Sequence, residues 1–415
     1  MSTSDSPAPS VASGGTAREV FVVFLRLGLT SFGGPVAHLG YFRDAFVVRR
    51  RWLGDRTYAD LVALCQFLPG PASSQVGMAI GLRRAGIGGL LAAWAGFTLP
   101  SAVLLVAFAY GVTAFGGDAG SGWIGGLKAA AVAVVAQAVL GMARTLAPDA
   151  RRATITGAAA IATLLAPSVL GLPVVLSQVG VIVLSGVAGL LWLSDPADDR
   201  DDEPFTVPVR RPVAVACLAV FGALLVALPL LAAATGGGAA RLVDIFYRAG
   251  SLVFGGGHVV LPLLEAELVP SGLVGHDQFL AGYGAAQAVP GPLFTFAGYL
   301  GAVTTSGPTG IAGATIALLA IFVPSALLVV GALPFWERLR GAPRARRALT
   351  GVNAGVVGLL AAALYDPVFT QGVLAAGEPL VALALAIGAY VALAKWSAPP
   401  WAVVIAAGLL GWVVL

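Results

Sequence analysis

The sequence predicts an all-α polytopic membrane protein with two homologous halves in inverted topology, each with broken or re-entrant helices. Three observations lead to this prediction: an apolar composition, a repeated set of sequence blocks, and an uneven distribution of arginine between the copies. Of 415 residues, 58% are hydrophobic and 11% are charged, and the mean hydropathy is +0.91. Soluble domains carry roughly a quarter charged residues, so most of this chain must lie in lipid.

Long apolar runs provide the expected membrane helices. The runs at 86–117, 171–194 and 211–236 reach or exceed the roughly 20 residues that a helix needs to cross a bilayer. Somewhat weaker runs occupy 123–147, 153–170, 308–334, 348–364, 373–394 and 399–415. We therefore expect about nine full spans and a multi-pass protein of the inner (plasma) membrane.

The chain divides into a tail, two repeats and a connector. Residues 1–17 are rich in Ser, Pro, Ala and Gly and have no basic segment ahead of an apolar one, which indicates a disordered, cytoplasmic N-terminal tail. The first membrane repeat is expected at 18–194 and the second at 240–415. Residues 195–239 are expected to hold a charged cytoplasmic linker and one unpaired span.

Four sequence blocks recur in the same order about 220 residues apart. "RLGLTSFGGPVAHLGYF" at 26–42 aligns with "RAGSLVFGGGHVVLPLL" at 248–264, and "QFLPGP" at 66–71 aligns with "QAVPGP" at 287–292. "FTLPSAVLLV" at 97–106 then matches "IFVPSALLVV" at 321–330, and "GLKAAAVAVVA" at 126–136 matches "GVNAGVVGLLA" at 351–361. Ordered matches of this kind indicate a duplication.

Arginines mark different loops in the two copies. In the first copy they follow the glycine block and the second broken segment, at Arg43, Arg49, Arg50, Arg51, Arg56, Arg83 and Arg84. In the second copy they cluster where the first has none, at Arg338, Arg340, Arg344, Arg346 and Arg347. Basic loops face the cytoplasm, so the copies are expected to be inverted, with the unpaired span at 213–235 providing the extra crossing.

Two segments of the first copy contain helix breakers near their middle. Both basic clusters can be cytoplasmic only if 20–42 and 57–84 each enter and leave the membrane on one face. "FGGP" at 32–35 and "LPGP" at 68–71 would permit such re-entrant segments, because proline and glycine interrupt helices. The rival interpretation is an ordinary spanning helix with a local violation of the charge rule.

The breaks are expected to meet near the membrane centre and to hold an anion, because half-helix N-termini offer free N–H groups. Ser73, Ser74 and Gln75 add polar lining that the second copy lacks, so we expect an asymmetric site. Asp244, Glu265 and Glu267 could carry protons, although solvation in loops is the simpler interpretation. The candidate substrate-binding residues are Arg26, Gly33, Gly34, His38, Gln66, Pro69, Gly70, Pro71, Arg248, Gly255, Gly256, His258, Gln287, Pro290, Gly291 and Pro292.

Each of these residues also has a structural interpretation. The arginines could snorkel to the interface, the glycines could ease helix packing, and the histidines could be satisfied core residues. The chain shows no paired membrane carboxylates, metal-ligand spacing or phosphate-binding loop, so no enzyme activity, cofactor or metal is expected. An enzyme acting on lipid phosphates is therefore disfavoured, and a purely structural protein would have no reason to duplicate the polar break. A channel for anions and a transporter of sulfate or another small anion stay open as alternatives.

At these blocks the sequence resembles the chromate ion transporter family in its long two-domain form. The resemblance covers almost the whole chain, and Gly257 departs from it where the first half has Pro35. It implies chromate export from the cytoplasm, sulfate as a competing anion, chromate resistance, inverted halves and coupling to an ion gradient. Expected partners are the bilayer, chromate or a sulfate-like anion, protons as a candidate coupling ion and a candidate homodimer, with no nucleic acid. The residues that carry the resemblance are Phe32, Gly33, Gly34, Pro35, His38, Gln66, Pro69, Gly70, Pro71, Phe254, Gly255, Gly256, His258, Gln287, Pro290, Gly291 and Pro292.

Overall fold

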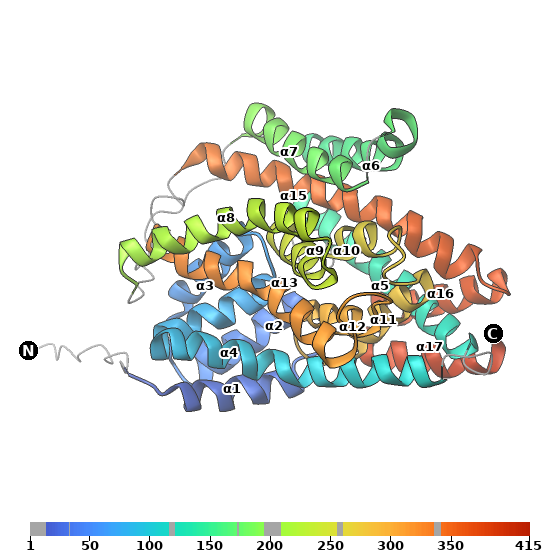
Figure 1. The fold of residues 1–415 in the computed structure, drawn as a ribbon, viewed down its shortest axis with the longest axis horizontal. Helices are drawn as coiled ribbons and strands as arrows, with labels where there is room; N and C mark the ends of the chain where they lie inside the picture. Colours follow the sequence, from blue (N-terminus) through green and yellow to red (C-terminus); the bar gives the residue numbers. More distant parts are fainter. Residues whose placement is uncertain are drawn as a thin grey trace, which may run out of the picture.

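Helices dominate the computed structural model, which describes residues 14–32, 34–115, 121–171, 174–194, 209–254, 260–335 and 342–415. No strand occurs in these ranges, which confirms the all-α class. Figure 1 shows most helices running along the long axis of the molecule, with α6 and α7 as a pair at one edge. Two homologous halves follow one another along the chain, separated by α8.

The first half begins with short helices and continues with long ones. Thr16 caps the first helix by accepting a hydrogen bond from the Glu19 backbone N–H at 3.1 Å, and Gly171 ends α6 with a left-handed φ of 63°. The elements are α1 (Ala17–Thr30), α2 (Gly34–Arg43), the π-helical η1 (Asp44–Arg49), α3 (Asp55–Phe67), α4 (Ala72–Phe115), α5 (Ser121–Leu146), α6 (Ala150–Leu170) and α7 (Val174–Trp192).

The second half repeats this order after α8 (Arg211–Thr235). Helices α9 to α11 correspond to α1 to α3, and the pair α12 and α13 corresponds to the two parts of α4. The elements are α9 (Gly238–Leu252), α10 (Val260–Leu268), α11 (His276–Ala288), η4 (Leu293–Thr295), α12 (Phe296–Val303), α13 (Gly310–Ala332), η5 (Leu333–Phe335), α15 (Pro343–Ala363), η6 (Leu364–Leu374), α16 (Pro379–Ala394) and α17 (Pro400–Val414).

Helix α4 is two antiparallel helices joined by a tight turn. Ala85 and Gly86 leave the helical region, and Gly86 has a φ of 62°. Gly81 and Gly89 pack backbone to backbone across this turn, as Gly301 and Gly313 do between α12 and α13. The same supersecondary unit is therefore present in both halves.

Five helices in the described ranges are long and apolar enough to cross a membrane. About nine full spans are expected from the sequence, and four further apolar helices in the described ranges are shorter. Each of the apolar runs does contain a helix, but α16 and α17 have 16 and 15 residues. At 1.5 Å per residue such helices extend about 24 Å, which is short of the roughly 30 Å hydrocarbon core. Helices that form part of a hairpin do not each need to span it.

The two broken segments of the first half begin and end close together, at a place that we call the entrance of the first half. Gly15 N–H donates to the Arg84 carbonyl at 3.1 Å, and the Arg84 guanidinium pairs with Glu19 and lies 4.9 Å from the Trp52 ring centroid. The start of α1, the loop after η1 and the end of residues 72–84 therefore meet. Each broken segment is therefore a helical hairpin whose two ends lie together, which is the geometry that a re-entrant segment requires.

The second half has the same arrangement at its own entrance. Thr305 N–H donates to the Leu273 carbonyl at 2.9 Å, which joins the turn after α12 to the loop after α10. Gly307 in that turn packs directly on Gly238, the first residue of α9. The pairs α9–α10 and α11–α12 are therefore hairpins as well.

The two entrances lie at opposite ends of one helix. Residues 87–115 start beside the entrance of the first half, at Ala85 and Gly86. Further along, the Tyr110 hydroxyl lies against Gly310, beside the entrance of the second half. Residues 87 to 110 of a helix extend about 35 Å, which is comparable to the thickness of a bilayer core.

The longer helices of each half pack against helices of the other half. Helix α5 packs against α16 and α17, whereas α15 packs against α6 and α7 (Figure 1). Helix α8 packs on α9 and α13, and most of its other side chains are exposed, including Val226 and Leu230. An apolar helix with this much exposed surface is suited to lipid.

Candidate functional site

The tips of the four hairpins meet in the middle of the molecule. Gly70 N–H, in the first Pro-Gly-Pro break, donates to the Val253 carbonyl at the end of α9, with an N–O distance of 2.6 Å. Gly291 N–H, in the second break, donates to the Ser31 carbonyl at the end of α1, with a distance of 3.0 Å. Gly70 and Gly291 are equivalent by sequence, as are Ser31 and Val253, so the halves meet with pseudo-twofold symmetry.

Glycine is required at the centre of both breaks. Gly70 has a φ of 120° and Gly291 a φ of 102°, a region that L side chains rarely adopt. A Cβ atom on Gly70 would lie 2.5 Å from Ser325 Oγ, and one on Gly291 would lie 2.8 Å from Ser101 Oγ. Ser101 and Ser325 follow the equivalent prolines Pro100 and Pro324, so this contact also repeats across the pseudo-twofold axis.

The prolines separate the two arms of each Pro-Gly-Pro hairpin. Leu68 and Val289, which precede Pro69 and Pro290, are extended with ψ values of 146° and 147°. The freed Pro69 carbonyl accepts a hydrogen bond from Gln75 Nε2 at 2.6 Å. After Pro71 and Pro292 the chain becomes helical again, so new helix N-termini start at the junction.

Buried polar atoms without hydrogen-bond partners in the described structure gather around this junction. Five of those named below are on the first half, where Ser31 and Gln75 stand in place of Val253 and Phe296 of the second. On the second half, Gln287 Nε2, three residues before Pro290, is a further buried atom without a partner. An unpaired buried hydroxyl or amide typically costs about 1–3 kcal/mol. The atoms are Ser31 Oγ, His38 Nε2, Ser74 Oγ, Gln75 Oε1, Thr98 Oγ1 and Ser325 Oγ.

His38 is enclosed beside the first tip. Its side chain is 1% exposed, its Nδ1 lies 3.4 Å from Ser73 Oγ, and its ring meets the Phe97 ring edge-on at 5.1 Å. Ser73 belongs to the first turn of α4, so the imidazole links the two hairpins of the first half. His258, the histidine predicted for the second half, lies outside the described residues.

The two equivalent arginines differ in surroundings. Arg26 is exposed on α1. Arg248 instead pairs with Asp244 at 2.9 Å and with Glu267 at 2.6 Å. Asp244 is 5% exposed, so the interpretation of Asp244 and Glu267 as solvated loop carboxylates is wrong. The positive charge of Arg248 is already neutralised in this arrangement.

The remaining predicted residues are spread around the tips. Gly34 starts α2 with a φ of 78°, Gln66 is exposed and Gln287 is half-buried. Gly33, Gly255 and Gly256 lie outside the described residues.

Two features of the structure are absent from the residues that the sequence predicts. The hydroxyls of Ser31, Thr98 and Ser325 carry no distinguishing signal in the sequence, because serine and threonine are common in membrane helices. Lys128 is also absent, although a lone lysine inside the apolar helix α5 is a signal of function. Its Nζ pairs with Asp277 Oδ1 of the second half at 2.9 Å.

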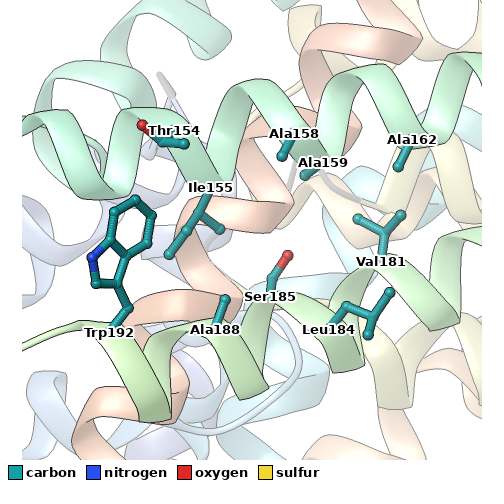
Figure 2. A pocket seen from close by; sticks show the side chains of 10 residues that line it. All are labelled: Thr154, Ile155, Ala158, Ala159, Ala162, Val181, Leu184, Ser185, Ala188 and Trp192. Atoms are coloured by element: carbon teal, nitrogen blue, oxygen red, sulfur yellow. The ribbon is translucent and has the colours of Figure 1, made fainter.

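A groove between α6 and α7 does not fit an anion. It encloses about 280 Å³ and, as Figure 2 shows, apolar side chains such as Ile155, Val181 and Leu184 line most of it. The Thr154 hydroxyl already donates to the Ala150 carbonyl. The junction of the tips offers many more polar groups, so it is the candidate substrate site.

The junction has the chemistry of an anion site. Helices α2 and α4 begin at the tips, and the first N–H groups of a helix have no partner within it. Hydroxyl, amide and imidazole groups add further donors without a carboxylate among them. No cluster of three potential metal ligands occurs in the described residues.

Comparison with known proteins agrees with this architecture. A sequence model described as "Chromate transporter" matches the chain twice, over residues 18–190 and 240–412. The chain is 30% identical to a chromate transport protein of Pseudomonas aeruginosa, over 95% of this chain and 92% of that protein. It is 26% identical to a chromate transport protein of Cupriavidus metallidurans, over 84% of this chain and 82% of that one.

A shorter relative matches about one half. The uncharacterized transporter YwrA of Bacillus subtilis is 30% identical over 41% of this chain and 93% of its own length. No solved structure matches the chain. The two matches of one family model, on a helical membrane protein with two homologous halves, show that this chain belongs to the chromate transporter family.

Proposed function

We propose that this protein exports chromate from the cytoplasm across the inner membrane by alternating access, driven by an ion gradient. The observation that carries the proposal is the reciprocal pair of hydrogen bonds, Gly70 to Val253 and Gly291 to Ser31, that joins the hairpin tips of the two halves. Interrupted helices in corresponding positions of two repeats are the usual binding site of secondary transporters. The junction belongs to both halves, so a rocking motion between them would expose it to either side.

The donors at the junction support a tetrahedral oxyanion as the cargo. The backbone N–H groups at the starts of α2 and α4 favour negative charge, and the buried Ser74 and Ser325 hydroxyls have no hydrogen-bond partner in the described structure. We assign the candidate residues at the tips, His38 and the glycines and prolines of the breaks, to this site. Arg26 has no acidic partner among the described ion pairs and could attract the anion toward it.

The charge pattern supports a cytoplasmic N-terminus and inverted halves. The entrance of the first half holds Arg84 and is close to the basic loop at 49–51. The turn at 304–309, at the other end of residues 87–115, has no basic residue. Basic loops face the cytoplasm, so the first hairpins would open inward and the second outward.

Radiolabelled chromate uptake into inside-out membrane vesicles tests the proposal. A proton gradient should stimulate uptake, and sulfate should compete with it. We expect Ser74→Ala and Ser325→Ala each to raise the KM about tenfold, because each removes one hydrogen bond to an anion. Ser306→Ala is the matched control, since Ser306 is exposed in the turn before α13.

Three results would count against this function. Native vesicles that take up no more chromate than empty ones would remove chromate as the cargo. Uptake that is insensitive to every imposed gradient would favour the alternative of an anion channel over a coupled transporter. Sulfate uptake with only weak chromate competition would identify a transporter of another oxyanion.

A further inference from the structure

The two halves do not pack identically around the tips. Helix α11 of the second half packs along α5 of the first, and a Cβ atom on Gly284 would lie 2.8 Å from the Leu127 carbonyl oxygen. Ala288, one turn further along, packs against the cluster that contains Leu127 and Ala130. This face of α11 is therefore closed onto α5.

In the described residues, the helices that correspond to α11 and α5 by the repeat do not pack closely against each other. Helix α3 is the counterpart of α11, and α15 is the counterpart of α5, but the described residues of α3 and α15 do not form a comparable interface. Equivalent positions differ in exposure as a result: Leu280 on α11 is fully buried, whereas Ala59 on α3 is exposed. The pseudo-twofold symmetry of the tips is broken at the helices that lead to them.

An ion pair joins the closed side. Lys128 on α5 pairs with Asp277 on the first turn of α11, and the Lys128 side chain is 10% exposed against 70% for Asp277. By sequence, the equivalent positions in the other half are Asn353 and Arg56, which cannot form an ion pair. The charged link therefore exists on one side only.

We propose that α11 against α5 is a closed gate latched by Lys128 and Asp277, and that the other state of the cycle opens it while α3 closes onto α15. The proposal rests on the alternating-access function proposed above. Repeats related by pseudo-symmetry can exchange their arrangements to produce a second state of similar energy. Asp277 lies near the entrance of the second half, so in the proposed topology this is the outer gate.

When the ion pair opens, the Lys128 ammonium is free to attract the anion during its release. An unpaired ammonium in an apolar helix is costly, so the open gate must provide water or another anion in place of Asp277. A departing oxyanion that passes along α11 would meet this charge. Opening would then be coupled to release.

A buried cysteine can report whether the gate is open. Ala281 is fully buried and lies one turn from both Asp277 and Gly284, on the face of α11 that packs on α5. We would introduce Ala281→Cys into full-length protein that carries Cys65→Ala and Cys217→Ala. Labelling by a membrane-impermeant maleimide would be followed in right-side-out vesicles, at a position that only an open gate exposes.

With the native pair, labelling should be slow. Lys128→Gln and Asp277→Asn should each accelerate it about fivefold, the effect of losing an ion pair with one exposed partner. The exchange Lys128→Asp with Asp277→Lys should restore slow labelling. Asp55→Asn, which removes the exposed Arg43–Asp55 pair within the first half, should change nothing.

Fast labelling with the native pair, or labelling that ignores both single variants in monodisperse protein, would overturn the latch. Asp277→Asn protects the test against misfolding, because Asp277 is exposed. The labelling needs no chromate flux. If labelling of the cysteine responds to the variants but vesicles take up no chromate, the latch is supported and the proposed function is rejected. If vesicles take up chromate but labelling does not respond, the function is supported and the latch is rejected.

Discussion

At the scale of single residues, Gly70 and Gly291 are constrained both by their backbone conformation and by their neighbours. Alanine at either position would need a disfavoured positive φ and would place a methyl group against a serine hydroxyl. We expect Gly70→Ala and Gly291→Ala to lower the free energy of unfolding by roughly 1–3 kcal/mol and to abolish chromate uptake. Thermal unfolding in detergent and vesicle uptake measure the two effects.

Gly236→Ala is the matched control for these variants. Gly236 also has a positive φ, of 59°, but no atom lies within 4 Å of the position that a Cβ would occupy. An equal loss in all three variants would mean that the backbone conformation alone, and not the packed junction, limits the tips.

Arg248 and Arg26 should respond differently to the same substitution. Arg248→Gln would leave the buried Asp244 carboxylate without its partner, a loss that costs about 3–5 kcal/mol in buried pairs. Adding Asp244→Asn should recover much of the stability. Arg26→Gln should leave the unfolding temperature unchanged, because Arg26 is exposed, and lower only the rate of transport. Equal destabilisation by both substitutions would contradict the difference in their surroundings.

At the scale of elements, the hairpins depend on close glycine contacts. Gly89→Ala would drive a methyl group into the Gly81 carbonyl, whereas Gly88→Ala places its methyl 3.6 Å from the Ala17 Cβ, an ordinary contact. We expect Gly89→Ala to cost about 1–3 kcal/mol and Gly88→Ala to be neutral in a thermal unfolding assay. Gly313→Ala should behave like Gly89→Ala, since Gly313 meets Gly301 in the same way.

The sequence was sufficient to predict the hairpins but not their contacts. Proline and glycine act on the chain locally, so the breaks at Pro69 and Pro290 could be located from composition and spacing. The bond from Gly70 to Val253 joins distant segments, and no local rule connects them. The pairing of Asp244 with Arg248 was within reach, because residues four apart share a helix face. The partner of Lys128 was not, since the repeat has Asn353 in its place.

At the scale of the whole molecule, two sets of contacts hold the halves together. The tips contact each other crosswise, and α5 and α15 each pack with the closing helices of the opposite half. A motion that separates α11 from α5 can therefore leave the tip hydrogen bonds in place, because neither bond involves the interface between α11 and α5. The junction would serve as the pivot and the helices around it as the gates.

The arrangement of the two entrances makes a definite prediction for topology. Gly54 lies exposed in the basic loop beside the entrance of the first half, and Ser306 lies exposed in the turn at the entrance of the second. In a chain with Cys65→Ala and Cys217→Ala, Ser306→Cys should react with an impermeant maleimide in right-side-out vesicles, whereas Gly54→Cys should react only in inside-out vesicles. Inverted halves require opposite sides, because the helix between the entrances is about 35 Å long. Reaction of both cysteines from the same side would mean that the halves are parallel and that the distribution of arginine does not report topology here.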